Sequence, residues 1–190
     1  MATNQSLVVT GTQILFNVAG SYAPATLNDI ELGTATDVPF DLTSIAAGAA
    51  EQSTKADFGA AWAPQYAVHA AVEFATAPVT GETFDFYWAP SVQSVAGAGN
   101  PGYTTGATGA YTGTPGTLAE GLLQLMFIGS LVCGADATAT IQTGFIAVFA
   151  PPTRYGNLVG VNSTSDAVHS DVVETAVSFT PIIPDLQAAA

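Results

Sequence analysis

The clearest hydrophobic pattern in the chain covers residues 66–89. Larger apolar side chains alternate with small or polar ones over residues 66–74, and aromatic side chains alternate with Asp85 and Tyr87 over residues 84–88. A period of two places alternate side chains on opposite faces of a strand. Pro78 and Gly81 lie between the two segments and are typical turn residues. The pattern predicts a β-hairpin whose apolar face comprises Tyr66, Val68, Val72, Phe74, Phe84, Phe86 and Trp88.

This apolar face needs a cover, because an isolated two-stranded ribbon is marginal in water. We expect further strands at residues 6–10, 14–19, 37–42, 52–58, 140–149, 158–162 and 172–180. The polar segment 52–58 is expected at a sheet edge. Residues 122–132 favour a strand buried on both sides, although Thr117 and Glu120 fit a capping box and would allow a short helix instead. Short strands without a sustained helical period predict an all-β fold, a single antiparallel β-sandwich or jelly roll.

The 190-residue length predicts one domain. We interpret residues 1–36 as an N-terminal extension with short strands, and residues 37–190 as the jelly-roll domain. A Gly/Thr-rich loop is expected at residues 91–121, with the densest Gly, Thr and Pro content at 91–116. Long loops inside compact domains are usually functional or interacting. We therefore expect an ordered excursion on the surface.

Charge and cysteine content exclude several classes of function. Fifteen carboxylates against two basic residues, Lys55 and Arg154, give a formal charge of −13. Neutralising nucleic-acid phosphates requires several Lys and Arg side chains, so neither nucleic acid nor anionic membrane is an expected partner. The single Cys133 excludes an internal disulfide, and the first residues lack the basic and apolar regions of a signal peptide. We expect folding in a reducing cytosol.

Motifs for cofactor and metal chemistry are weak. Residues 97–102 match G-x-G-x-x-G, but neither the strand before nor the helix after them is predicted, which favours a plain loop. His69 and His169 are a hundred residues apart, so the clustered histidines of a metal-dependent cupin are absent. The sequence therefore predicts no cofactor and no metal.

Catalytic arrangements are equally weak. Cys133 follows an apolar segment, where a thiol is more often inert than activated. Glu73, Glu82 and Asp85 could converge as a glycosidase pair, but neighbouring acids are expected by chance on so acidic a surface. The sequence thus predicts a protein that is not an enzyme, and a glycoside-processing enzyme is the weakest alternative.

Four segments carry a resemblance to a known group: residues 42–53, the 66–89 segment, the Gly-rich loop and residues 154–162. Together they resemble the jelly-roll head cement or decoration proteins of tailed bacteriophages, over about residues 37 to 181. The segment before residue 37 and the long 91–121 loop depart from that pattern, and we expect them to serve this protein's own neighbours.

The resemblance implies a virion structural protein, made in the host cytoplasm and added to the capsid exterior, where it bridges capsomers. Its implied partners are the major capsid protein and further copies of itself. The alternative is a binding module, such as a lectin-like or receptor-binding domain of a head fibre or tail.

Candidate partner-interface residues are Tyr103, Tyr111, Arg154 and Tyr155. Arginine and tyrosine are enriched in interface hot spots, and loops carry recognition on rigid β scaffolds. Arg154 has two open roles: it contacts a partner, or it pairs with a carboxylate of this chain. The second role is favoured, because an arginine among many acids has local partners.

Overall fold

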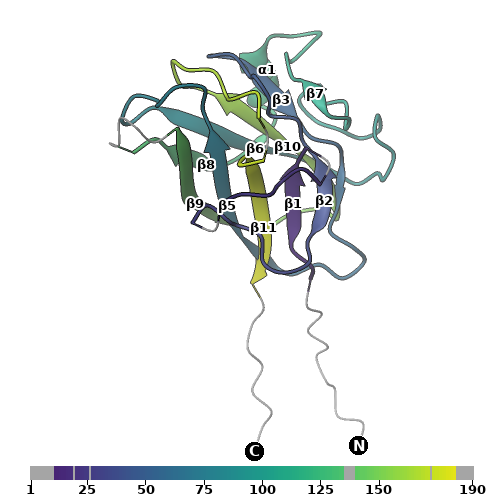
Figure 1. Cartoon of the computed structure of the whole chain (residues 1–190). Helices are drawn as coiled ribbons and strands as arrows, with labels where there is room; N and C mark the ends of the chain where they lie inside the picture. The colour runs from purple at the N-terminus through teal and green to yellow at the C-terminus, as the bar shows by residue number, and fades with distance from the viewer. Residues whose placement is uncertain (1–10, 19, 26, 135–139, 172, 183–190) are drawn as a thin grey trace, which may run out of the picture.

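The computed structural model describes residues 11–18, 20–25, 27–134, 140–171 and 173–182. These residues form two packed sheets (Figure 1). Sheet A contains, in spatial order, β2 (Thr36–Pro39), β1 (Ile14–Asn17), β11 (Ala176–Ile182), β5 (Gln65–Glu73) and β9 (Ile141–Phe149). Sheet B contains β7 (Gly109–Ala110), β3 (Ala50–Gln52), β10 (Tyr155–Asn162), β6 (Thr83–Ser91) and β8 (Met126–Val132), and β4 (Ala56–Asp57) pairs with β10. Helix α1 (Leu118–Leu122) precedes β8.

Strand pairing is nested along the chain. β1 pairs with β11, β3 with β10, β5 with β9 and β6 with β8, and all four pairs are antiparallel. Successive pairs alternate between sheet A and sheet B. The β1–β2 pair is parallel. The predicted all-β antiparallel sandwich is therefore confirmed.

The core lies between the sheets and is dominated by aromatic rings. Phe84, Phe86 and Trp88 are fully buried, so they form core and not an exposed platform for ligand stacking. The Trp88 ring of sheet B lies 5.7 Å, centroid to centroid, from both Phe149 and Phe179 of sheet A. Such aromatic pairs add about 0.5–1.5 kcal/mol each beyond the area that they bury.

The predicted 66–89 hairpin is wrong, although the face that it buries is right. β5 pairs with β9 and β11 in sheet A, whereas β6 pairs with β8 and β10 in sheet B. Residues 74–82 therefore cross from one sheet to the other. Alternation shows which face of a strand is buried, and two strands facing each other across roughly 10 Å of core have the same pattern as two that share hydrogen bonds.

Residues 122–132 do not form one strand buried on both sides. Thr117 caps α1, since its hydroxyl accepts from the Glu120 N–H at 3.3 Å and the Glu120 carboxylate accepts from the Thr117 N–H at 2.9 Å. This is the capping box of the helical alternative. β8 begins at Met126, and Phe127 is 58% exposed because β8 is an edge strand of sheet B.

The first strands are built into the sandwich. β1 belongs to the segment interpreted as an extension, yet it lies between β2 and β11, and Phe16 is fully buried. Residues 14–17 and residue 36 of this segment are thus strand residues of sheet A. The expected strand at residues 6–10 lies outside the described residues. Residues 52–58 contribute to β3 and β4, and only the two-residue β7 separates β3 from the sheet edge. Within the described residues, no helix has the length and apolar character needed to cross a membrane.

Candidate functional site

Residues 101–125, which we call the loop–helix cover, lie over the outer face of sheet B. Their apolar side chains form a second small core with outward-facing residues of β3 and β10; this cluster comprises Ala50, Tyr87, Tyr111, Leu118, Leu122, Leu125, Val159 and Val161. In Figure 1, α1 lies close to β3, and β7 pairs with β3 at the edge of sheet B. The expected ordered excursion is therefore present, and it has a hydrophobic anchor of its own.

Gly102 fixes the turn at the start of the cover. Its N–H donates to Gln124 Oε1 at 3.3 Å, and its carbonyl accepts from the Tyr111 hydroxyl at 2.5 Å. The Gly102 φ of +62° suits glycine, and a Cβ there would lie 2.8 Å from the Gly121 carbonyl oxygen. Both backbone polar groups of Gly102 are thus bonded to side chains from elsewhere in the cover.

Tyr103 directly follows this turn and lies at the surface. It adopts φ +61°, which is uncommon for a residue with a side chain, and it is 43% exposed. A non-glycine residue held in this region stores about 1–3 kcal/mol, and such residues cluster at functional sites. Leu123, the C-cap of α1, is 87% exposed. The sequence and the fold therefore present an aromatic and an aliphatic side chain on a rigid support.

Tyr103 and Leu123 line one open hollow of about 670 Å³, together with Pro115, Gly116, Glu120 and Gln124. Glu120 is the single charged residue in this lining. Its carboxylate is already bonded to Thr117, and Gln124 Oε1 is bonded to Gly102. One carboxylate oxygen of Glu120 and the amide oxygen of Gln124 are therefore already engaged within the cover.

The chain's single lysine holds the neighbouring loop. Lys55 Nζ donates to Ser91 Oγ and to the carbonyls of Gln93, Val95 and Ala98 at 2.8–3.0 Å. Partial burial lowers the pKa of Lys55. Lys55 is thus a structural tie for residues 91–98 and is not presented to a partner.

Arg154 forms the internal pair that the sequence favoured. Its Nε lies 2.6 Å from Asp57 Oδ1 and its Nη2 lies 2.8 Å from Asp57 Oδ2. The hydrogen bond from Arg154 lowers the pKa of Asp57. The guanidinium carbon also lies 4.9 Å from the centre of the Tyr155 ring. Arg154 and Tyr155 therefore lie together at the β4–β10 pair, outside the hollow around Tyr103.

The structure separates the four predicted interface residues. Tyr103 is at the surface, whereas Tyr111 is 2% exposed and supports Tyr103 from beneath. The sequence reasoning missed Leu123, because it assigned residues 122–132 to a buried strand. The capping box at Thr117 and Glu120 was the available signal, because it marks the start of the short helix α1, whose C-cap is Leu123.

Residues considered for catalysis are engaged elsewhere. Glu73 Oε2 lies 3.8 Å from His169 Nδ1, Glu82 accepts from the backbone of Val79 and Ser165, and Asp85 accepts from the Ser130 and Ser163 hydroxyls. Burial raises the pKa of the Cys133 thiol to about 11, which keeps it protonated. Residues 97–102 form a loop without a helix directly after it. Among the described residues, no group of three or more His, Cys, Asp or Glu side chains could hold a metal ion.

Comparison of the chain with protein-family models, with curated proteins and with solved structures finds no match.

Proposed function

We propose that this protein is a capsid decoration protein, which binds the outside of an icosahedral phage head and bridges neighbouring capsomers. The observation that carries the proposal is the hollow around Tyr103 and Leu123. Both side chains are exposed on a cover fixed by buried hydrogen bonds, with little charge around them. A rigid surface of this kind loses little conformational entropy on binding.

The strand order supports the same proposal. The nested pairs β1–β11, β3–β10, β5–β9 and β6–β8 support a double-sheet jelly roll as the proposed form of this sandwich. Jelly rolls occur in viral capsid proteins, in lectins and in cupins. Fold alone does not determine function, so this point adds only to the surface and to the sequence resemblance.

The proposed mechanism is mechanical. Packaged DNA strains a shell at the seams between its subunits, and repeated binding at symmetric positions adds contact area there without any chemistry. The partners would be the major capsid protein and further copies of this chain. The strongly acidic body would avoid nucleic acid and anionic membrane. Charge attraction to the shell would reach only about 8 Å at 0.15 M salt.

The test is cosedimentation with undecorated heads of the parent phage. We expect wild-type protein to pellet with the heads and Leu123→Ser to bind more weakly, since it loses an exposed apolar contact without a change in the core. Leu27→Ser is the matched control: Leu27 is 96% exposed but lies in the segment that covers sheet A. Decorated heads should also retain DNA better than bare heads on heating or osmotic shock.

Two results would contradict the proposal: equal fragility of bare and decorated heads, or a location on the tail. Equal loss of binding in both leucine variants would show that the contact with the head is not specific to the hollow around Tyr103.

A second candidate function is a binding module for glycans or a receptor. It is favoured by one observation: an aromatic ring, an amide and a carboxylate from Tyr103, Gln124 and Glu120 line the same hollow. A few polar groups beside an apolar ring are typical of small-ligand sites. Tight binding to a glycan array, lost in Tyr103→Asn, would favour this alternative. Asparagine tolerates the positive φ at this position.

A further inference from the structure

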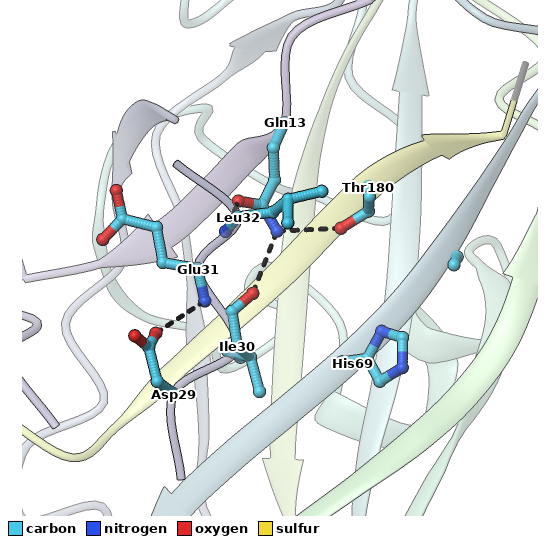
Figure 2. A pocket seen from close by; sticks show the side chains of 8 residues that line it. Gln13, Asp29, Ile30, Glu31, Leu32, His69 and Thr180 are labelled. Carbon is cyan, nitrogen blue, oxygen red and sulfur yellow. Dashed lines mark hydrogen bonds between the residues drawn. The ribbon is translucent and has the colours of Figure 1, made fainter. Parts of the chain in front are cut away.

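The outer face of sheet A carries a separate hollow of about 320 Å³ (Figure 2). On one side lies the segment 29–32, and on the other lies β5 with Ala67 and His69. Thr180 of β11 is part of the lining. This site lies on the sheet opposite the loop–helix cover, so it is independent of the hollow around Tyr103.

The wall formed by residues 29–32 is fixed in place by Gln13, which is 5% exposed. Its Nε2 donates to the Ile30 carbonyl at 2.9 Å and to Thr180 Oγ1 at 2.8 Å, and its Oε1 accepts from the Leu32 N–H at 2.7 Å. Figure 2 shows these bonds to the Ile30 carbonyl and Thr180. A buried amide with three bonds to its surroundings makes the hollow a preformed feature.

Tyr22 supports the same wall from behind. Its hydroxyl donates to the Asn28 carbonyl at 2.7 Å and accepts from the Ile30 N–H at 3.1 Å. Burial raises the pKa of Tyr22 to about 12, so the hydroxyl keeps the proton that it donates. The backbone on both sides of Asp29 is therefore held by one ring.

Two carboxylates, Asp29 and Glu31, stand at the rim, and no ion pair joins either of them to another described residue. Asp29 Oδ1 accepts from the Glu31 N–H at 2.9 Å, and the Glu31 carboxylate has no hydrogen-bond partner among the described residues. The described ion pairs join Arg154 to Asp57 and His169 to Glu73, and Lys55 is bonded to residues 91–98. Neither Lys55 nor Arg154 therefore pairs with Asp29 or Glu31.

An apolar surface continues from the hollow toward β9. Phe145 is the cross-strand partner of His69, and their rings lie 5.3 Å apart; Val148 is the partner of Ala67. Phe145 is 58% exposed and Leu32, on the opposite wall, is 71% exposed. The hollow is thus large enough for a side chain, and the surface beside it extends over more than one residue.

We propose that this hollow on sheet A binds a segment of a partner protein in which a lysine or arginine stands beside an apolar side chain. The apolar side chain would lie between Leu32 and His69, and the cation would meet Asp29 and Glu31. A second copy of this chain fits poorly, because its two basic side chains are already bonded internally.

The test uses the whole protein and two capped synthetic heptapeptides, one centred on Leu-Arg-Leu and one in which citrulline replaces arginine. Binding is measured by titration with amide NMR shifts as the readout. We expect the arginine peptide to shift amides of Leu32 and His69, and to bind less tightly at high salt. Asp29→Asn with Glu31→Gln should weaken it by about threefold to tenfold, the range for two exposed charge pairs. Asp41→Asn, a distant exposed acid whose Oδ1 acceptor is kept, should change binding little.

Three outcomes would overturn the proposal. Equal affinity for the citrulline peptide would show that the hollow does not recognise a cation. Amide shifts confined to the loop–helix cover would show that the peptide binds there and not in the hollow on sheet A. Concentration-dependent shifts of the same amides without peptide would assign the hollow to a second copy of the chain. Leu32→Ser provides a further check, since it lowers affinity only if the apolar half of the hollow is used.

Discussion

The outer faces of the two sheets are covered to different extents. On sheet B, residues 101–125 pack a full apolar cluster over β3 and β10. On sheet A, Tyr22, Ile30 and Ala35 pack only over Leu15 of β1 and Ala176 of β11. β5 and β9 stay outside this smaller cover, and Phe145 on β9 is exposed. Sheet B therefore has the larger cover and carries its hollow on that cover, around Tyr103, whereas the hollow of sheet A lies at the margin of the smaller cover.

Both covers use the same device to hold their backbone. Tyr111 bonds to the carbonyl of Gly102, and Tyr22 bonds to the main chain of Asn28 and Ile30. A buried hydroxyl that satisfies a loop peptide removes the penalty of leaving that peptide unpaired. The two faces thus differ in how much of each sheet is covered, and each uses a buried tyrosine hydroxyl to hold the backbone of its cover.

The largest expected effect is on the core that both faces share. Phe86→Ala should lower the free energy of unfolding by about 3–5 kcal/mol, because it leaves a cavity where a fully buried ring was. Urea unfolding measures the loss, and hydrogen exchange should show both covers losing protection together. Phe127→Ala is the control, since this ring on the adjacent β8 is 58% exposed. A soluble Phe86 variant of unchanged stability would mean that this face is open and would favour sugar stacking.

The second prediction compares the two tyrosines. Tyr111→Phe and Tyr22→Phe should each reduce stability by about 1–2 kcal/mol, because each leaves buried main-chain groups without a partner. Hydrogen exchange should then increase near residues 101–103 in the first variant and near residues 28–32 in the second. If hydrogen exchange increased in both covers in either variant, the two covers would be coupled. They could then not be treated as independent regions.

The third prediction concerns one acid on each sheet. Burial, with a smaller contribution from Asp41, raises the pKa of Glu51 on β3 to about 7. The folded state then holds a proton that the unfolded state releases, so stability falls as the pH rises from about 4.5 to 7. Glu51→Gln should remove this loss and stabilise the protein at pH 8 by about 1 kcal/mol, after allowance for solvent screening.

Glu73 on β5 is the matched acid of sheet A. Burial also raises its pKa, but the nearby His169 opposes the shift. Glu73→Gln should therefore stabilise the protein less at pH 8 than Glu51→Gln does. Thermal melts of both variants at pH 5 and pH 8 measure the difference. An equal gain from both at pH 8 would mean that burial opposes ionisation of the two carboxylates to the same extent.

The sequence predicted the buried faces well and the strand partners poorly. Alternation identified the inward side chains of β5 and β6, since a period of two depends only on the strand itself. Pairing depends on which other strand lies beside it, and residues 78–81 are compatible with a hairpin turn or with a crossover between sheets. The local pattern around Pro78 and Gly81 contains no information that separates the two.

The candidate surfaces were predicted only in part. The loop containing Tyr103 was expected to interact, but the exposed Leu123 required the helix that the capping box indicates. The hollow on sheet A could not be found from the sequence. It depends on Gln13 reaching across to Thr180, a contact between residues 167 positions apart. Such a contact follows from the β1–β11 pairing and not from any local motif.

The smallest expected effect is at the Arg154–Asp57 pair on the β4–β10 edge of sheet B, away from both hollows. Asp57 has a lowered pKa in the folded state, so the pair stabilises the protein above the unfolded pKa and loses its effect as the pH falls through the folded value. Arg154→Ala should therefore lower the melting temperature slightly at neutral pH and low salt, and by less in strong acid, where only the contact with the Tyr155 ring is lost. Asp57→Asn should match it, and the double variant should add nothing, as expected for two residues whose main contact is each other. Binding to heads should be unchanged in all three variants. Lost binding at unchanged stability would instead assign Arg154 to a partner contact, and would place a third binding surface on the edge of sheet B.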